Sequence, residues 1–322
     1  MNRALLSWIL MVALAGVAGS RAKASTPSQG TVFKSSVELV ALNVVVTDAR
    51  QRFVRDLDER DFVVTEDGVR QDITFFAGGQ VPLDLILLID TSSSMGYLRP
   101  VVQRAASGFL RVLRPEDRGA VLGFSSGVRV LQDLTSDRAA LRNAVASAGA
   151  NGDTSLYTAL FVTLRRLEKP AQQASQVRRQ AIVVLTDGGE NASGLGYEDL
   201  LEEARGHGVA IYAIMMQSDE LRQLEHLAGR LLPARQNIKD LARETGAGAY
   251  FPKEADELSG VYETIAAELT NQYSIAYAPR PLVPSRVLHE VSVRVPSRPT
   301  LFTRARTRYL SGEPSVKMAP LR

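Results

Sequence analysis

Three oxygen-bearing side chains follow an apolar run in the first third of the sequence. Asp90, Ser92 and Ser94 have the pattern D-x-S-x-S, and residues 85–89 before them are all leucine or isoleucine. A short apolar run that ends in polar residues is typical of a strand buried on both faces. One carboxylate and two hydroxyls on a loop are ligands that hard divalent cations such as Mg²⁺ prefer. The sequence therefore predicts a metal site at the carboxyl end of a buried strand.

Two later fragments carry further oxygen ligands. Thr154 precedes an expected helix, and Asp187 follows a second apolar run in residues 181–185. In a doubly wound sheet, the carboxyl ends of neighbouring parallel strands lie on the same edge. The three loops can therefore converge, so that three hydroxyls and two carboxylates would surround one point.

A different pattern, Gly123 to Gly127, matches the G-x-S-x-G nucleophile elbow of serine hydrolases. In that elbow a strand leads directly into a helix, but here Val128 to Leu131 continues as a strand. A triad also needs a histidine, and the chain has only three, none in a recognisable catalytic context: His207, His226 and His289. A hydrolase that uses Ser125 or the metal is the main alternative to a binding site, and a structural module of an envelope assembly is a third.

The elements that must position these residues lie in residues 82–270, where strand patterns alternate with helical ones. This alternation predicts an α/β domain with a doubly wound, mainly parallel sheet. A charged stretch at residues 217–236 adds an expected amphipathic surface helix, with partner binding there as an alternative. We expect the other helices at Val101 to Leu113, Asp137 to Ala148, Ser155 to Leu167, Tyr197 to Arg205, Ile238 to Thr245 and Ala255 to Leu269.

The segments on either side of this domain, residues 25–81 and 271–322, have strand patterns without helices. Neither segment alone offers a large sheet, so we expect residues 271–322 to pair with residues 35–81 in an accessory β domain. A hairpin signal, Glu66-Asp67-Gly68, separates two of the expected N-terminal strands. Those strands are Val37 to Val46, Phe53-Val54, Phe62 to Val64 and Ile73 to Phe76. The C-terminal segment has arginines at period two, which predict a solvated strand face: Arg304, Arg306 and Arg308.

The N-terminus and the composition indicate the compartment and exclude several functions. Residues 1–24 have a basic start, an apolar stretch and an Ala-Lys-Ala end, which is typical of a cleaved secretory signal peptide. A retained membrane anchor is the alternative, and no later segment could span a bilayer. With no cysteine the chain has no disulfide or thiolate site, and a net charge of +3 gives no indication of nucleic-acid binding. No feature predicts an oligomeric state.

From Pro82 to Leu269 the sequence resembles the von Willebrand factor type A domain family. The family's metal-ion-dependent adhesion site has the pattern D-x-S-x-S, then Thr, then Asp, and every element is present here in that order: Asp90, Ser92, Ser94, Thr154 and Asp187. The resemblance implies a Rossmann-like domain. It also implies that the two serines, and at times the threonine, bind the cation directly, whereas the two aspartates act largely through water.

The resemblance implies a function in adhesion rather than catalysis. Mg²⁺, or Mn²⁺ or Ca²⁺ in its place, would bind an Asp or Glu side chain of a protein partner. The flanking segments, from VVVTDARQRF before the domain to RARTRYL after it, resemble exported bacterial proteins with such domains, seen especially in acidobacteria. We therefore expect an exported, periplasmic or extracellular protein that binds a protein partner through a metal ion and is not an enzyme.

Overall fold

The computed structural model describes residues 39–79, 81–149, 151–173, 177–190, 192–216, 223, 233–280 and 286–312. The predicted signal peptide, residues 1–24, lies outside the described residues, as does most of the predicted amphipathic helix at 217–236, of which residues 223 and 233–236 are described. Within the described part of the chain, no helix is both long and apolar enough to cross a lipid bilayer.

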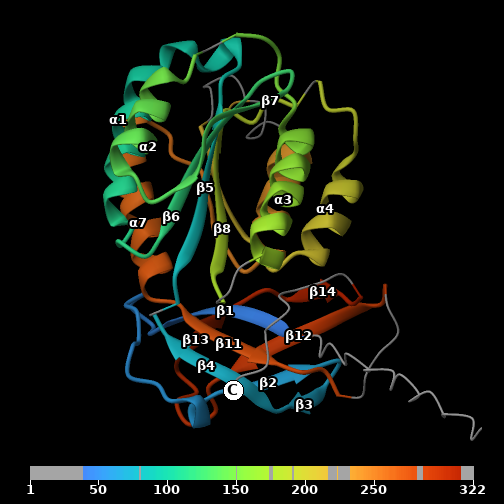
Figure 1. The fold of residues 1–322 in the computed structure, drawn as a ribbon. Helices are drawn as coiled ribbons and strands as arrows, with labels where there is room; N and C mark the ends of the chain where they lie inside the picture. Colours follow the sequence, from blue (N-terminus) through green and yellow to red (C-terminus); the bar gives the residue numbers. More distant parts are fainter. Residues whose placement is uncertain are drawn as a thin grey trace, which may run out of the picture. The chain divides into compact units, whose positions relative to one another are not determined.

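A six-stranded sheet lies at the centre of the α/β domain, in the order β10-β9-β8-β5-β6-β7 (Figure 1). All neighbours pair in parallel except β6 and β7, which form an antiparallel hairpin. This confirms the predicted doubly wound, mainly parallel sheet. Its strands are β5 (Leu83–Asp90), β6 (Arg118–Phe124), β7 (Val128–Thr135), β8 (Arg179–Thr186), β9 (Ala210–Met215) and β10 (Ala249–Tyr250).

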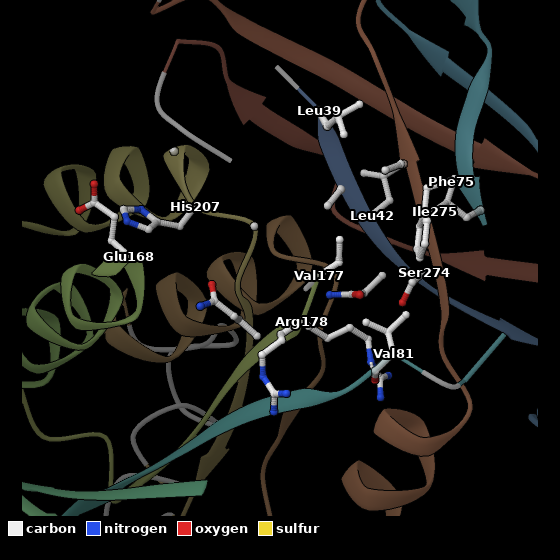
Figure 2. Close-up of a pocket in the computed structure, with 17 residues that line it drawn as sticks. Leu39, Leu42, Phe75, Val81, Glu168, Val177, Arg178, His207, Ser274 and Ile275 are labelled. Atoms are coloured by element: carbon white, nitrogen blue, oxygen red, sulfur yellow. Dashed lines mark hydrogen bonds between the residues drawn. The ribbon is translucent and has the colours of Figure 1, made fainter. Parts of the chain in front are cut away.

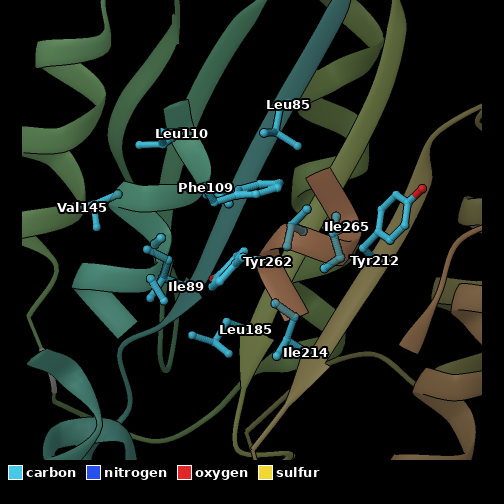
Figure 3. Close-up of a cluster of buried hydrophobic side chains, with 14 of the residues drawn as sticks. Leu85, Ile89, Phe109, Leu110, Val145, Leu185, Tyr212, Ile214, Tyr262 and Ile265 are labelled. Carbon is cyan, nitrogen blue, oxygen red and sulfur yellow. The ribbon is translucent and has the colours of Figure 1, made fainter. Parts of the chain in front are cut away.

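The central strand β5 is buried at all eight positions because helices cover both faces of the sheet. Its side chains alternate between two apolar clusters: Leu85, Leu87 and Ile89 belong to one, and Ile86 and Leu88 to the other. Figure 3 shows the first cluster, where α1 and α7 contribute Phe109 and Tyr262 with ring centroids 5.0 Å apart. One face is covered by α1 (Arg99–Phe109), α2 (Arg138–Ser147) and α7 (Leu258–Thr270), and the other by α3 (Leu156–Gln173), α4 (Tyr197–Gly206) and α6 (Pro233–Glu244).

Several helix boundaries differ from the prediction. The helix expected at Val101 to Leu113 begins at Arg99 and ends at Phe109, where a 3₁₀ segment follows. Helix α3 continues to Gln173 rather than ending at Leu167, so Lys169-Pro170 does not end it. Helix α6 begins at Pro233, five residues before the expected start, and α7 begins only after a short 3₁₀ turn. The short 3₁₀ segments are η1 (Glu59–Asp61), η2 (Ser93–Tyr97), η3 (Leu110–Val112) and η4 (Ala255–Glu257).

The flanking segments form two four-stranded antiparallel sheets, in the orders β13-β1-β11-β4 and β14-β12-β2-β3 (Figure 1). Each sheet combines N-terminal and C-terminal strands, and their inward side chains share one apolar core. The accessory β structure predicted from the flanks is thus confirmed, whereas the exact domain boundaries stay predictions. The strands are β1 (Val40–Thr47), β2 (Val63–Glu66), β3 (Val69–Gln71), β4 (Ile73–Gly78), β11 (Tyr273–Tyr277), β12 (Leu288–Arg294), β13 (Phe302–Arg304) and β14 (Arg308–Leu310).

Two predictions about these strands are wrong. Phe53 makes only an isolated bridge with Thr47, so Phe53-Val54 is not a strand. The turn at Asp67-Gly68 joins β2 to β3, which the sequence analysis missed, while β4 pairs with β11 in the other sheet.

The predicted solvated face of three arginines is also wrong, because the strand breaks between β13 and β14. Arg306 lies in the break, is 8% exposed and donates a hydrogen bond of 2.7 Å to the carbonyl of Arg205. Arg304 pairs with Glu268. A period-two pattern places side chains on one face only while the strand is continuous.

A buried carboxylate fixes the start of β5, the strand that carries Asp90. Asp117 is 3% exposed and accepts hydrogen bonds of 2.8 Å from the backbone N–H groups of Leu83 and Arg114. The Arg114 guanidinium also donates to it. Burial alone would raise the pKa of the Asp117 carboxyl, but the hydrogen bonds from Arg114 and Leu83 outweigh burial and hold the pKa below its ordinary value of 3.8.

We expect Asp117→Asn to lower the free energy of unfolding by about 1–3 kcal/mol at pH 7, because it removes charge-assisted hydrogen bonds. The folded-state pKa is lower than the unfolded one, so this stabilisation is present above pH 3.8 and is lost as the pH falls through the folded pKa. Urea titrations at pH 7 and pH 3 test this, with Glu116→Gln as a control at an exposed neighbouring carboxylate. An equal loss at both pH values would contradict it.

Candidate metal site

The predicted site lies where β5 and β8 end, on neighbouring parallel strands. Their register pairs Ile89 with Leu185, so Asp90 and Thr186 come at the same level of the sheet. The loops after these strands therefore leave the same edge, as the sequence analysis expected.

Asp90 is 3% exposed, and both of its carboxylate oxygens accept hydrogen bonds. The backbone N–H of Ser92 donates to Oδ1 at 2.8 Å, and the Thr186 hydroxyl donates to Oδ2 at 2.7 Å. Burial raises the pKa of the Asp90 carboxyl, and the charge of Asp187 adds to this, whereas the hydrogen bonds from Ser92 and Thr186 oppose it. Asp90 thereby holds both the loop after β5 and the end of β8.

The two serines of the D-x-S-x-S pattern lie side by side. Ser92 precedes η2 and Ser94 lies within it, with 3.1 Å between their Oγ atoms. Ser92 is buried and Ser94 is exposed, so the pair extends from the loop interior to the surface. Backbone hydrogen bonds, Ser93 N–H to Gly152 at 3.0 Å and Asn151 N–H to Thr91 at 2.7 Å, fasten this loop to the one that carries Thr154.

The Thr154 and Asp187 side chains both lie next to Gly189. A Cβ placed on Gly189 would lie 3.3 Å from Asp187 Oδ1 and 3.3 Å from Thr154 Oγ1, so both oxygens flank this glycine. Thr154 is buried, and Asp187 is partly exposed. The structure thus brings Asp90, Ser92 and Ser94 together on one loop and brings Thr154 and Asp187 together beside it.

Glu190, which the sequence analysis did not single out, ties the Asp187 loop to the start of α3. Its carboxylate accepts hydrogen bonds from the N–H of Tyr157 at 2.9 Å, the N–H of Ser193 at 3.0 Å and the Ser193 hydroxyl at 2.8 Å. Thr186 was also missed, although it stands directly before the predicted ligand Asp187. No local pattern distinguishes either residue, because their roles depend on contacts with distant segments.

The charges at the site favour a cation. Among the described residues, Asp90 has no arginine or lysine within ion-pair distance, whereas buried Asp84 pairs with Arg118 and Arg178. Two carboxylates that have no basic partner among the described residues, together with three hydroxyls, fit a hard divalent cation, whose ligands are oxygens. The role of these five residues as metal ligands stays a prediction.

Ser125 of the G-x-S-x-G pattern lies in the turn of the β6–β7 hairpin, so no helix follows it. Within the described residues, its backbone N–H donates to the carbonyl of Gly127 at 3.0 Å and its carbonyl accepts from the N–H of Ser155 at 2.9 Å. Of the histidines, His207 follows α4, His289 lies in β12, and His226 is outside the described residues. This geometry lacks the strand-to-helix turn that a nucleophile elbow requires.

A pocket elsewhere in the chain contains none of the predicted metal ligands (Figure 2). It has a cavity volume of about 70 Å³ and lies where the start of β8 approaches β1 and β11. Its lining is mostly apolar, with Leu42, Val81 and Ile275 among the side chains shown. The predicted metal site and this pocket are therefore separate.

Comparison with known protein families identifies the central part of the chain. Residues 84–240 match the von Willebrand factor type A domain. The narrower resemblance of the flanking segments to exported acidobacterial proteins stays a prediction.

Several solved structures are similar at low identity. A von Willebrand factor type A protein from Catenulispora acidiphila is 12% identical, with 86% of this chain and 75% of that chain covered and a TM-score of 0.48. Proximal thread matrix protein 1 from the mussel byssus, solved with a zinc-occupied MIDAS motif, is 18% identical over 64% of this chain, with a TM-score of 0.49. This chain covers 50% of that mussel protein. BatB from Bacteroides thetaiotaomicron is 16% identical over 58% of this chain and 97% of its own, with a TM-score of 0.43.

Proposed function

Because residues 84–240 form a von Willebrand factor type A domain, we propose that this protein is an exported module that binds a protein partner through a divalent cation. The observation that carries the proposal is the convergence of three loops on one edge of the sheet. These loops carry the five residues of the predicted adhesion site: Asp90, Ser92, Ser94, Thr154 and Asp187.

Mg²⁺ is the cation we propose, with Mn²⁺ or Ca²⁺ as substitutes. The hydroxyls of Ser92, Ser94 and Thr154 would hold it directly, and the carboxylates of Asp90 and Asp187 would hold it largely through water. When bound, the cation supplies an electrophilic centre for an incoming carboxylate. Neutral hydroxyl ligands leave more of its positive charge for that carboxylate than direct carboxylate ligands would.

The partner would be a protein that offers an Asp or Glu side chain. Tyr97, which ends the 3₁₀ segment after the serines, is 73% exposed, and exposed aromatic side chains are enriched at protein interfaces. It would contact the partner beside the cation. We propose binding without catalysis, since the β6–β7 hairpin does not give Ser125 the environment of a nucleophile. Location in the periplasm or outside the cell follows from the predicted signal peptide and belongs to the proposal.

Calorimetric titration with Mg²⁺ and Mn²⁺ tests the site through two adjacent serines. Ser94→Ala removes a proposed ligand, and we expect it to weaken metal binding at least about tenfold. Ser93→Ala is the matched control, because Ser93 is also exposed but its side chain is outside the D-x-S-x-S pattern. Equal affinities of the wild type and Ser94→Ala would show that the hydroxyl does not hold the cation.

A further inference from the structure

The buried carboxylates of the described residues fall into two groups according to their charge partners. Four of them pair with arginine: Asp84 with Arg118 and Arg178, Asp117 with Arg114, Glu203 with Arg165, and Glu268 with Arg304. The other two, Asp90 and Glu66, have no arginine or lysine within 4.0 Å in the described part of the chain. Asp90 belongs to the proposed metal site, so the charge partner of Glu66 needs an explanation of its own.

Glu66 ends β2, is 5% exposed and is oriented by two tyrosines. The hydroxyls of Tyr277 and Tyr309 both donate to its Oε2, at 2.6 Å and 3.0 Å. Its other oxygen, Oε1, accepts no hydrogen bond from any described residue and lies 3.7 Å from Nδ1 of His289. The tyrosines thus hold the carboxylate with one oxygen free and directed at an imidazole.

Asp67 completes the group. Its Oδ2 lies 2.7 Å from His289 Nδ1, and its side chain is 52% exposed at the β2–β3 turn. His289 is 2% exposed, and its ring stacks on Tyr309 with 5.1 Å between centroids. One atom each of Glu66, Asp67 and His289 lie within 4.8 Å of one another. The three side chains therefore converge in the β sheets, and Asp67 opens the group to solvent.

Neither a neutral nor a protonated His289 balances this group well. With a neutral imidazole, the buried Glu66 carboxylate lies beside Asp67 with no arginine or lysine within 4.0 Å among the described residues, and burying an unpaired charge is costly. A protonated imidazole supplies one positive charge for two carboxylates and places a charged Nε2–H in the core, where Nε2 has no hydrogen-bond partner among the described residues. A divalent cation supplies two positive charges and leaves the imidazole neutral.

We propose that Glu66, Asp67 and His289 bind a divalent transition-metal cation, with Zn²⁺ the best match. One imidazole nitrogen and two carboxylate oxygens form a ligand set that suits zinc, and water would complete the coordination. The hydrogen bonds from the tyrosines to Glu66 and the stacking of Tyr309 on His289 orient the ligands as outer-shell contacts do in metal sites. To admit the cation, Asp67 Oδ2 would move away from His289 Nδ1, while Oδ1 can keep the hydrogen bond of 2.9 Å that it accepts from the N–H of Glu290.

The second histidine near a buried carboxylate provides an internal comparison. His207 Nδ1 lies 3.6 Å from Glu203 Oε1, but Glu203 already pairs with Arg165, and His207 Nδ1 contacts the Glu203 carbonyl at 2.8 Å. The His207–Glu203 pair therefore contains only one carboxylate, and Arg165 already supplies the positive charge for it. We therefore expect zinc at His289 and not at His207.

Histidine ¹⁵N spectra of the full chain with Zn²⁺ as the probe test this proposal. The background is the Ser92→Ala/Ser94→Ala variant, in which the first metal site is disabled. We expect one equivalent of Zn²⁺ to shift the imidazole signal that is missing in His289→Gln, and the same shift to persist in His207→Gln. An unchanged His289 signal would overturn the proposal, and the group would then be a hydrogen-bonded network only.

Asp67→Asn provides a second variant that should fold, because Asn tolerates the left-handed backbone at this turn, where φ is +48°. We expect it to reduce Zn²⁺ affinity at least about tenfold and to remove the rise in melting temperature that Zn²⁺ causes in the parent chain. Zn²⁺ binding by Asp67→Asn at the parent affinity would also overturn the proposal. Both outcomes are independent of partner binding at the Mg²⁺ site.

Discussion

A chain truncated after Gln272 is expected to lose hydrogen-exchange protection in its N-terminal strands while the α/β domain stays protected. The reason is the position of the removed strands, since β11 lies between β1 and β4, and β12 lies between β14 and β2. The truncation also removes β13, the other neighbour of β1, so β1 and β4 have no partner and β2–β3 remains as a lone hairpin. A two-stranded hairpin is at best marginally stable in water.

The shared core gives the same expectation. It has seven buried side chains before residue 80, and the truncation removes the other seven: Tyr273, Ile275, Tyr277, Val291, Val293, Val295 and Tyr309. Losing half of the core in this way leaves the remaining apolar side chains exposed. The hydrophobic stabilisation that remains is then smaller than the conformational entropy lost when these short strands become ordered.

Hydrogen exchange followed by mass spectrometry measures the effect peptide by peptide. Peptides from β1 and β4 should exchange at the rate of an unfolded chain, whereas peptides from β5 and β8 should remain slow. A chain that ends at Gly312 retains every described strand and is the control. Full protection of β1 in the chain that ends at Gln272 would show that the N-terminal strands fold without the C-terminal ones.

The α/β architecture could be predicted because its signals are local. The apolar runs before Asp90 and Asp187 mark buried strands by themselves, and the alternation with amphipathic helices implies parallel pairing. Strand partners in the β sheets could not be predicted in the same way. Val40 pairs with Tyr277, although the two residues are far apart in the sequence. Which strands pair over such a separation depends on the packing of the whole core.

The same distinction applies to the sites. The D-x-S-x-S pattern is contiguous, so Asp90, Ser92 and Ser94 were predicted from the sequence. Glu66 and His289 belong to strands that become neighbours only in the folded sheet, through the pairing of β2 with β12. Arg306 was misplaced for a related reason, since its burial depends on the strand break and on Arg205 in another element.

The largest functional effect is expected from removing the cation or one of its hydroxyl ligands. A partner that binds through a carboxylate should lose binding in EDTA and when Ser92 is replaced by alanine. Ser92 is 1% exposed and its Oγ lies 3.1 Å from that of Ser94, so Ser92→Ala removes a proposed metal ligand without removing apolar packing. Loss of a strong contact at an interface centre costs about 2 kcal/mol or more, which is at least about tenfold in affinity.

The partner can be captured from an envelope extract on the immobilised protein with Mg²⁺ and eluted with EDTA, and its affinity can then be measured for each variant. Ser93→Ala should bind it as the wild type does, while Ser92→Ala and Thr154→Ala should not. Replacing the partner's contacting Asp or Glu by its amide should have the same effect, because the amide oxygen lacks the charge that the cation attracts. If the partner binds Ser92→Ala in EDTA with wild-type affinity, the cation is structural and the protein recognises its partner through another surface.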